Sequence, residues 1–182
     1  MGMYLNIGND GFRAARNGEY VDKSELISVV NSTLCSERQF SCARRFGKSM
    51  AAKMLNAYYD KSCNSHSLFQ DLKIASDPSF EKHLNKYPVI FLDMTEFVTQ
   101  FRDDASIVDY IQLKLIKELQ TTYPNVDYSF GNDLLSVLYA ITKQVETQKF
   151  IMIIDEWDAI FREFAPESNI AAKYIDLLRM LF

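Results

Sequence analysis

The sequence lacks the features of membrane-spanning and secreted chains. No run of about 18 apolar residues occurs in its 182 residues, so no membrane-spanning helix is expected. The first ten residues, MGMYLNIGND, contain no basic segment followed by an apolar one and therefore do not resemble a signal peptide. We expect a cytoplasmic protein.

An excess of basic charge is also missing. Lys and Arg number 20 against 24 Asp and Glu, which gives a net charge of −4. This balance does not predict a broadly basic surface for nucleic acid, although a local basic site remains compatible with it. The length and the 48% content of hydrophobic residues are typical of one globular domain with a buried core.

Cysteine is scarce, and its spacing is poor for a metal site. Cys63 and His66 have a C-x-x-H spacing, and Cys35 and Cys42 would complete four zinc ligands. However, Cys35 and Cys42 are seven residues apart rather than in a tight knuckle. Reduced, unpaired thiols are the favoured interpretation for a cytoplasmic chain.

Hydrophobic patterning predicts helices that alternate with buried strands. Residues 88–93 are a continuous apolar segment closed by Asp93, and residues 150–154 are a second one closed by Asp155 and Glu156, as in strands covered on both faces. The predicted helices cover residues 22–34, 48–59, 77–86, 104–121, 132–147 and 168–182, and residues 39–43 are a weak strand candidate. This alternation predicts an α/β fold with a parallel sheet.

Several side chains are assigned places in these helices. Asp77 and Asn132 are predicted to cap helices, with Pro78 at a first helical position. The residues expected to face the core at helical spacing are Met50, Met54, Ala57 and Tyr58, then Ile107, Tyr110, Ile111, Lys114, Leu115 and Leu119, and finally Ile175, Leu178 and Leu181.

The first motif with chemical meaning opens the helix at 48–59. Gly47-Lys48-Ser49 matches the second half of the phosphate-binding pattern G-x-x-x-x-G-K-[ST], whose first glycine falls on Cys42. Glycine lets the backbone approach phosphate oxygens, and the start of a helix presents positive partial charge to an anion. In that role Lys48 reaches the β and γ phosphates, and Ser49 offers a hydroxyl to Mg²⁺. The alternative is an ordinary helix cap.

The second motif is an apolar strand that ends in two acids. Asp155 would hold Mg²⁺, and Glu156 would act as a general base on the water that attacks the γ phosphate. Both would lie at the carboxyl edge of a parallel sheet, where ligands bind in such folds. A pair of acids that caps the next helix is the alternative, but the two motifs in this order, about a hundred residues apart, favour nucleotide binding.

Neighbouring residues carry weaker signals. Asp93 ends the other strand, and capping of the following turn is favoured over contact with water or Mg²⁺. Arg44 and Arg45 flank the phosphate loop and would either pair with phosphate oxygens or remain solvated. Packing in the core is favoured over stacking on a nucleobase for three aromatic residues, Trp157, Phe161 and Phe164.

These segments, together with Tyr20-Val21-Asp22-Lys23, resemble the bacterial AAA-ATPase-like family over nearly the whole chain. Members often carry a PD-(D/E)XK nuclease-like domain further along. The resemblance implies a three-layer α/β/α P-loop NTPase fold with a mainly parallel sheet, over residues 1–182. It also implies binding of ATP and Mg²⁺, with nucleotide contacts from Arg45, Phe46, Gly47, Lys48 and Ser49, Mg²⁺ ligands Ser49 and Asp155, and Glu156 as the catalytic residue.

Two departures from the family pattern stand out. Residues 40–43 lead straight into Arg44, so about three residues at the start of the phosphate loop are missing and fewer N–H groups would surround phosphate. After Ile154 only helix is predicted, whereas this class places a central strand later in the sequence. We therefore expect an incomplete domain that is either the N-terminal part of a larger protein or a truncated copy.

Two classes of function follow. The first is an ATP-binding domain that hydrolyses Mg-ATP and drives a conformational change in a protein partner or a missing domain. The second is a degenerate module that acts as an interaction scaffold or self-associates. Nucleic-acid processing rests only on the family's frequent nuclease domain, because the sequence has no basic run or aromatic platform.

Overall fold

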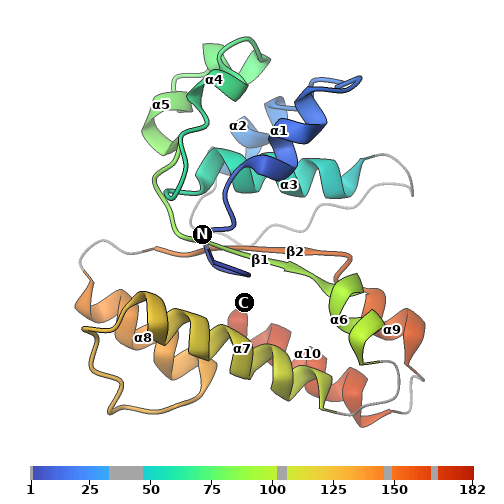
Figure 1. The fold of residues 1–182 in the computed structure, drawn as a ribbon, viewed down its shortest axis with the longest axis vertical. Coiled ribbons are helices and arrows are strands. Elements are labelled where there is room, and N and C mark those ends of the chain that lie inside the picture. Colours follow the sequence, from blue (N-terminus) through green and yellow to red (C-terminus); the bar gives the residue numbers. More distant parts are fainter. Residues whose placement is uncertain (1, 33–46, 102–105, 146–148, 165–167) are drawn as a thin grey trace. The chain divides into compact units, whose positions relative to one another are not determined.

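The computed structural model describes residues 2–32, 47–101, 106–145, 149–164 and 168–182 of an α/β chain. The chain forms two compact units, each assembled from separate segments (Figure 1). Unit 1 contains residues 6–91 and 150–153, and unit 2 contains residues 2–5, 92–149 and 154–182, within the described ranges. Among these residues, no helix combines the length and apolar character needed to cross a membrane.

The helices of unit 1 are α1 (Asp10–Arg16), α2 (Glu25–Asn31), α3 (Lys48–Tyr59), α4 (His66–Phe69), the 3₁₀ helix η1 (Lys73–Ser76) and α5 (Phe80–His83). Those of unit 2 are α6 (Met94–Gln100), α7 (Ile107–Thr122), α8 (Leu134–Gln144), α9 (Ala159–Glu163) and α10 (Asn169–Leu181). The candidate strand at 39–43 lies outside the described residues.

Two strands, β1 (Val89–Asp93) and β2 (Ile151–Asp155), pair in parallel and confirm the predicted class of sheet. The backbone N–H of Ile151 donates to the carbonyl of Pro88 at 3.0 Å, which helps to set their register. The apolar residues of β1 are buried as predicted, but those of β2 are only half-buried. The expectation of full burial is wrong for β2 because, in the described part of the chain, it pairs with β1 alone.

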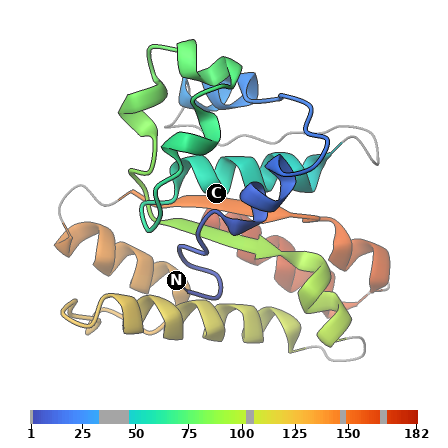
Figure 2. The ribbon, with the colours of Figure 1, turned by 45° about the horizontal axis from the view of Figure 1, so that its top comes forward.

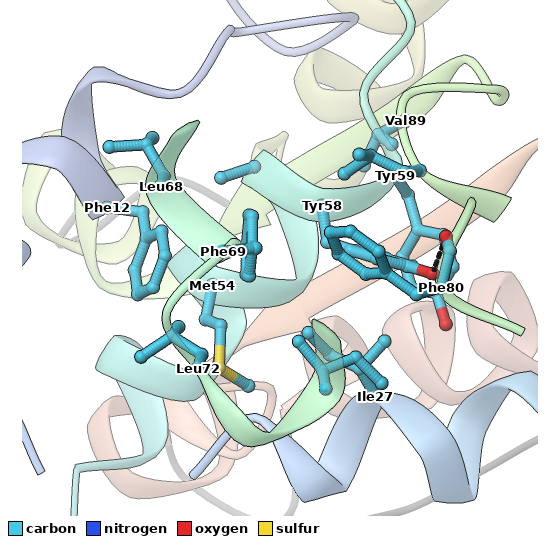
Figure 3. Packing of buried hydrophobic residues seen from close by; sticks show 13 residues of the cluster. Phe12, Ile27, Met54, Tyr58, Tyr59, Leu68, Phe69, Leu72, Phe80 and Val89 are labelled. Atoms are coloured by element: carbon cyan, nitrogen blue, oxygen red, sulfur yellow. Dashed lines mark hydrogen bonds between the residues drawn. The ribbon is translucent and has the colours of Figure 1, made fainter. Parts of the chain in front are cut away.

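Aromatic packing forms the core of unit 1 (Figure 3). Phe12 of α1 stacks on Phe69 of α4 at 4.9 Å between ring centroids, and Tyr58 of α3 meets Phe69 edge-on at 5.5 Å. All three rings are fully buried, and burial of each contributes about 1.5–3 kcal/mol relative to exposure. This packing fixes α3 against the helices that cover it.

The bounds of α3 agree with the prediction, but its buried face differs at one end. Met54, Ala57 and Tyr58 are buried, whereas Met50 is 36% exposed. The prediction for Met50 is wrong because the core covers the last two turns of α3 rather than its first. The side of the first turn of α3 that carries Met50 is therefore exposed to solvent.

Helix packing gives unit 2 its own core. Figures 1 and 2 show α7 and α8 side by side. The apolar members of the predicted stripe of α7 are buried, except that Tyr110 is half-buried, as is Lys114. The predicted face of α10 is wrong, since Ile175 is 36% exposed while Tyr174 and Leu177 are buried. Tyr174 contributes a ring that packs beside Phe161 at 5.8 Å, and this aromatic contact turns α10 by about one residue from the predicted register.

Two predicted helix starts are also wrong for local reasons. Asp77 accepts the backbone N–H of Ser79 at 2.8 Å and forms a turn, so α5 begins at Phe80. The cap of α8 is Asp133 rather than Asn132, because the Asp133 carboxylate accepts the N–H of Ser136 at 3.0 Å. In both cases the short acidic side chain competes for a nearby backbone N–H.

Burial of Tyr58 predicts a loss of stability in alkali. Its hydroxyl donates to the carbonyl of Phe80 at 2.7 Å, and burial raises its pKa from 10.0 to about 12. Below pH 10 the tyrosine is neutral in both states; above it the unfolded chain loses the proton first, so stability falls as pH rises from 10 towards 12.

We therefore expect Tyr58→Phe to be less stable than the parent at pH 8 by about 1 kcal/mol, through loss of the hydrogen bond. The difference should shrink at pH 11, because only the parent has this group to ionise. Urea unfolding at the two pH values measures both differences. Tyr139→Phe, at a tyrosine that is 56% exposed, is the control, and an unchanged difference would contradict the prediction.

Candidate functional site

The first part of the candidate site is the start of α3 in unit 1. Gly47 caps the helix in a left-handed conformation with φ of 78°, and Lys48 and Ser49 are the first two helical residues. Glycine adopts this conformation without the steric cost that a Cβ atom brings. The carbonyl of Gly47 accepts the N–H of Ala51 at 3.0 Å, so the bend is joined directly to the first helical turn.

The remaining residues of this motif lie outside the described part of the chain. They are Cys42, Arg44, Arg45 and Phe46. The predicted nucleotide contacts of Arg45 and Phe46 therefore stay predictions. Within the described residues, Gly47, Lys48 and Ser49 have the order and the helix-start position that a phosphate-binding turn requires.

A second lysine lies beside this turn, and the sequence analysis gave it no role. A methyl group built on Gly47 would be 3.2 Å from Nζ of Lys23. Lys23 is distant from Gly47 in sequence and precedes α2, so no local spacing could have predicted the approach. The only signal in the sequence was its place in the Tyr20–Lys23 segment of the family resemblance.

The second part of the candidate site is the end of β2 and the turn that follows it in unit 2. Asp155 is 7% exposed, and its Oδ1 accepts the N–H of Glu156 at 3.0 Å. Glu156 has φ of 50°, a left-handed conformation that costs a residue with a Cβ atom about 1 kcal/mol. Such strain at the end of a strand is frequent at functional sites.

An arginine binds the carboxylate of Glu156. Nη2 of Arg162, on α9, lies 2.9 Å from Oε2 of Glu156, while Nη1 contacts Asp158 at 3.1 Å. The hydrogen bond with Glu156 is the main reason why the pKa of Arg162 is raised. The three side chains are partly exposed, so these ion pairs contribute little stability, about 0–1 kcal/mol each. Their effect is to fix where the Glu156 carboxylate lies.

The other acids and aromatic residues resolve the remaining alternatives. Asp93 caps α6 by accepting the N–H of Thr95 at 2.9 Å, which confirms the capping interpretation. Phe164 is buried, as expected of a core residue. Trp157 is 42% exposed, and the core prediction is wrong for it because it lies in the turn between β2 and α9. Its indole meets Phe161 edge-on at 5.9 Å.

Cys63 behaves as a packed thiol. Its Sγ lies 3.4 Å from the carbonyl of Asp60, and burial raises the pKa of the thiol. His66 Nε2 contacts the carboxylate of Glu81 at 3.1 Å. Cys35 and Cys42 are outside the described residues, and the described ones contain no group of three or more His, Cys, Asp or Glu side chains suited to a metal ion.

Comparison with protein families gives one finding. The family described as Predicted AAA-ATPase matches residues 6–182. Comparisons with curated proteins and with solved structures found no match.

The left-handed conformation of Glu156 leads to a stability test. Glu156→Gly and Glu156→Ala both remove the ion pair with Arg162, but only glycine relieves the steric cost. We expect the glycine variant to be more stable by about 1 kcal/mol in chemical unfolding.

The same two substitutions at Glu163 are the matched control. Glu163 is the last residue of α9 and does not have a positive φ. There the order should reverse, with alanine more stable than glycine by about 0.5–1 kcal/mol. If the alanine variant were more stable than the glycine variant at both positions, Glu156 would not be strained.

Proposed function

The chain belongs to the Predicted AAA-ATPase family, and on that premise we propose that residues 1–182 form a P-loop domain that binds and hydrolyses Mg-ATP. A three-layer α/β/α arrangement around a mainly parallel sheet is part of this proposal. Hydrolysis would drive a conformational change in a protein partner. We place this activity in the cytoplasm.

The observation that carries the proposal is the start of α3. Gly47 is left-handed, has no side chain and leads directly into Lys48 and Ser49. A backbone of this shape lets N–H groups approach phosphate oxygens, and the positive end of the helix dipole attracts their charge. An ordinary helix cap explains Gly47 but gives no reason for a lysine at the first position, where the helix dipole disfavours a cation.

The oxygen ligands suit Mg²⁺. Ser49, in unit 1, offers a hydroxyl, and Asp155, in unit 2, offers a carboxylate whose Oδ1 accepts the adjacent N–H of Glu156 at 3.0 Å. Mg²⁺ prefers hard oxygen ligands and keeps several waters, so a hydroxyl or a carboxylate of this kind suits it beside the phosphates. The bound ion would neutralise charge that develops on the phosphates.

Glu156 is the proposed general base. Its carboxylate must accept a proton from the attacking water, and the ion pair with Arg162 fixes where that carboxylate lies. The same pair also occupies one carboxylate oxygen, Oε2. Proton transfer therefore uses the other oxygen or follows opening of the pair.

Lys48 provides the first test. We expect Lys48→Ala to weaken Mg-ATP binding by at least tenfold, because a charge-assisted contact contributes about 1.5–3 kcal/mol. Titration calorimetry on the 182-residue chain measures the change. Lys53→Ala removes an exposed lysine from the same helix and should bind as the parent does. Parent-like affinity in Lys48→Ala would contradict the phosphate-binding assignment.

Glu156 provides the second test. Glu156→Gln keeps the size of the side chain but removes its basicity, so Mg-ATP binding should persist while phosphate release falls by about 10²-fold or more. Glu163→Gln, on α9, is the matched control. Turnover at the parent rate in Glu156→Gln would exclude it as the base. A folded parent chain without Mg-ATP binding would instead favour a scaffold function.

A further inference from the structure

We propose that Lys23 is a second phosphate-binding cation, which acts with Lys48 at the start of α3. The inference rests on the proposed nucleotide site and extends it by a residue from outside the phosphate-binding motif. Its basis is the approach of Lys23 Nζ to Gly47, at 3.2 Å from the position of a glycine-to-alanine methyl group. The ammonium group therefore lies beside the backbone that would contact phosphate.

The backbone around Lys23 is held in place by hydrogen bonds on both sides. Asp22 accepts N–H groups from Ser24 and Lys73 at 2.8 and 2.9 Å, and the Ser24 hydroxyl accepts the N–H of Ile74 at 3.1 Å. Ser24 is fully buried. These bonds join the segment before α2 to η1 within unit 1. Lys23 thus extends from a fixed base rather than from a loose loop.

The electrostatics favour an anion of high charge at this place. The first turn of α3 contains no acidic residue, and its first residue is Lys48. Lys23 brings a second positive charge beside the start of this helix. A di- or triphosphate has enough charged oxygens to contact both lysines and the first N–H groups of α3, whereas a single carboxylate has only two oxygens.

The absence of a side chain at Gly47 has a second meaning in this arrangement. Any larger residue would be strained at φ of 78° and would also crowd the Lys23 ammonium at 3.2 Å. The φ of 78° is the reason for glycine at this position, and beside a larger residue the end of the Lys23 side chain would have to move by a few tenths of an ångström.

The test is Mg-ATP titration of Lys23→Met, Lys23→Arg and the control Lys82→Met. Methionine keeps the length and apolar stem but removes the charge, and Lys82 is an exposed lysine of α5 in the same unit. We expect Lys23→Met to bind about tenfold or more weakly, with most of the affinity restored in Lys23→Arg. Lys82→Met should remain within about twofold of the parent.

A second measurement separates phosphate contact from a structural effect. The affinity of the parent for Mg-ATP should fall with added salt, and this dependence should be shallower in Lys23→Met, which has one charged contact fewer. A folding defect would weaken binding without changing the salt dependence, and circular dichroism would detect it. An unchanged salt dependence together with weaker binding would overturn the proposal.

The outcomes distinguish this inference from the proposed function. If Lys48→Ala loses Mg-ATP binding while Lys23→Met binds as the parent does, the nucleotide site stands and the role of Lys23 is refuted. If the folded parent does not bind Mg-ATP, both are refuted. Selective weakening in Lys23→Met, with rescue by arginine, supports both.

Discussion

Burial of one face of α3 is the constraint on which the candidate phosphate site depends. The last two turns of this helix pack into the aromatic core of unit 1 through Met54, Ala57 and Tyr58. The core fixes the axis of α3 and therefore the direction of its first N–H groups. Gly47 and Lys48 are held in position by packing that takes place about two turns away from them. The last two turns of α3 thus belong to the core, and its first turn belongs to the candidate site.

The same helix shows how far sequence reasoning reaches. The helix at 48–59 was predicted with the observed bounds because of its strong periodicity, and the strand at 88–93 to within one residue because of its continuous apolar run. The start of α5 and the cap of α8 were missed because Asp77 and Asp133 bind nearby N–H groups, and several acids compete for such places. The buried face of α10 depended on Tyr174 meeting Phe161, a tertiary contact that no local pattern encodes.

Some features of the candidate site follow from local sequence, and others depend on the folded structure. Gly47, Lys48, Ser49, Asp155 and Glu156 could be proposed as candidates from the sequence because motif spacing and strand ends are local properties. The φ of Glu156, its ion pair with Arg162 and the approach of Lys23 to Gly47 could not. Each depends on segments that meet only after folding, or on a backbone angle that glutamate seldom adopts. The strained glutamate is where local preference and structure disagree, as is common at functional positions.

The turn after β2 also has a spectroscopic consequence. Trp157 is the only tryptophan of the chain, and it directly follows Glu156 with its indole partly exposed beside Phe161. Indole emission responds to local polarity and to nearby charges, so the tryptophan fluorescence of this chain, excited selectively at the red edge of the absorption band, originates at this single turn. A rearrangement of the Glu156 carboxylate would change that emission without any attached dye. The natural sequence thus contains its own optical probe for the proposed catalytic residue.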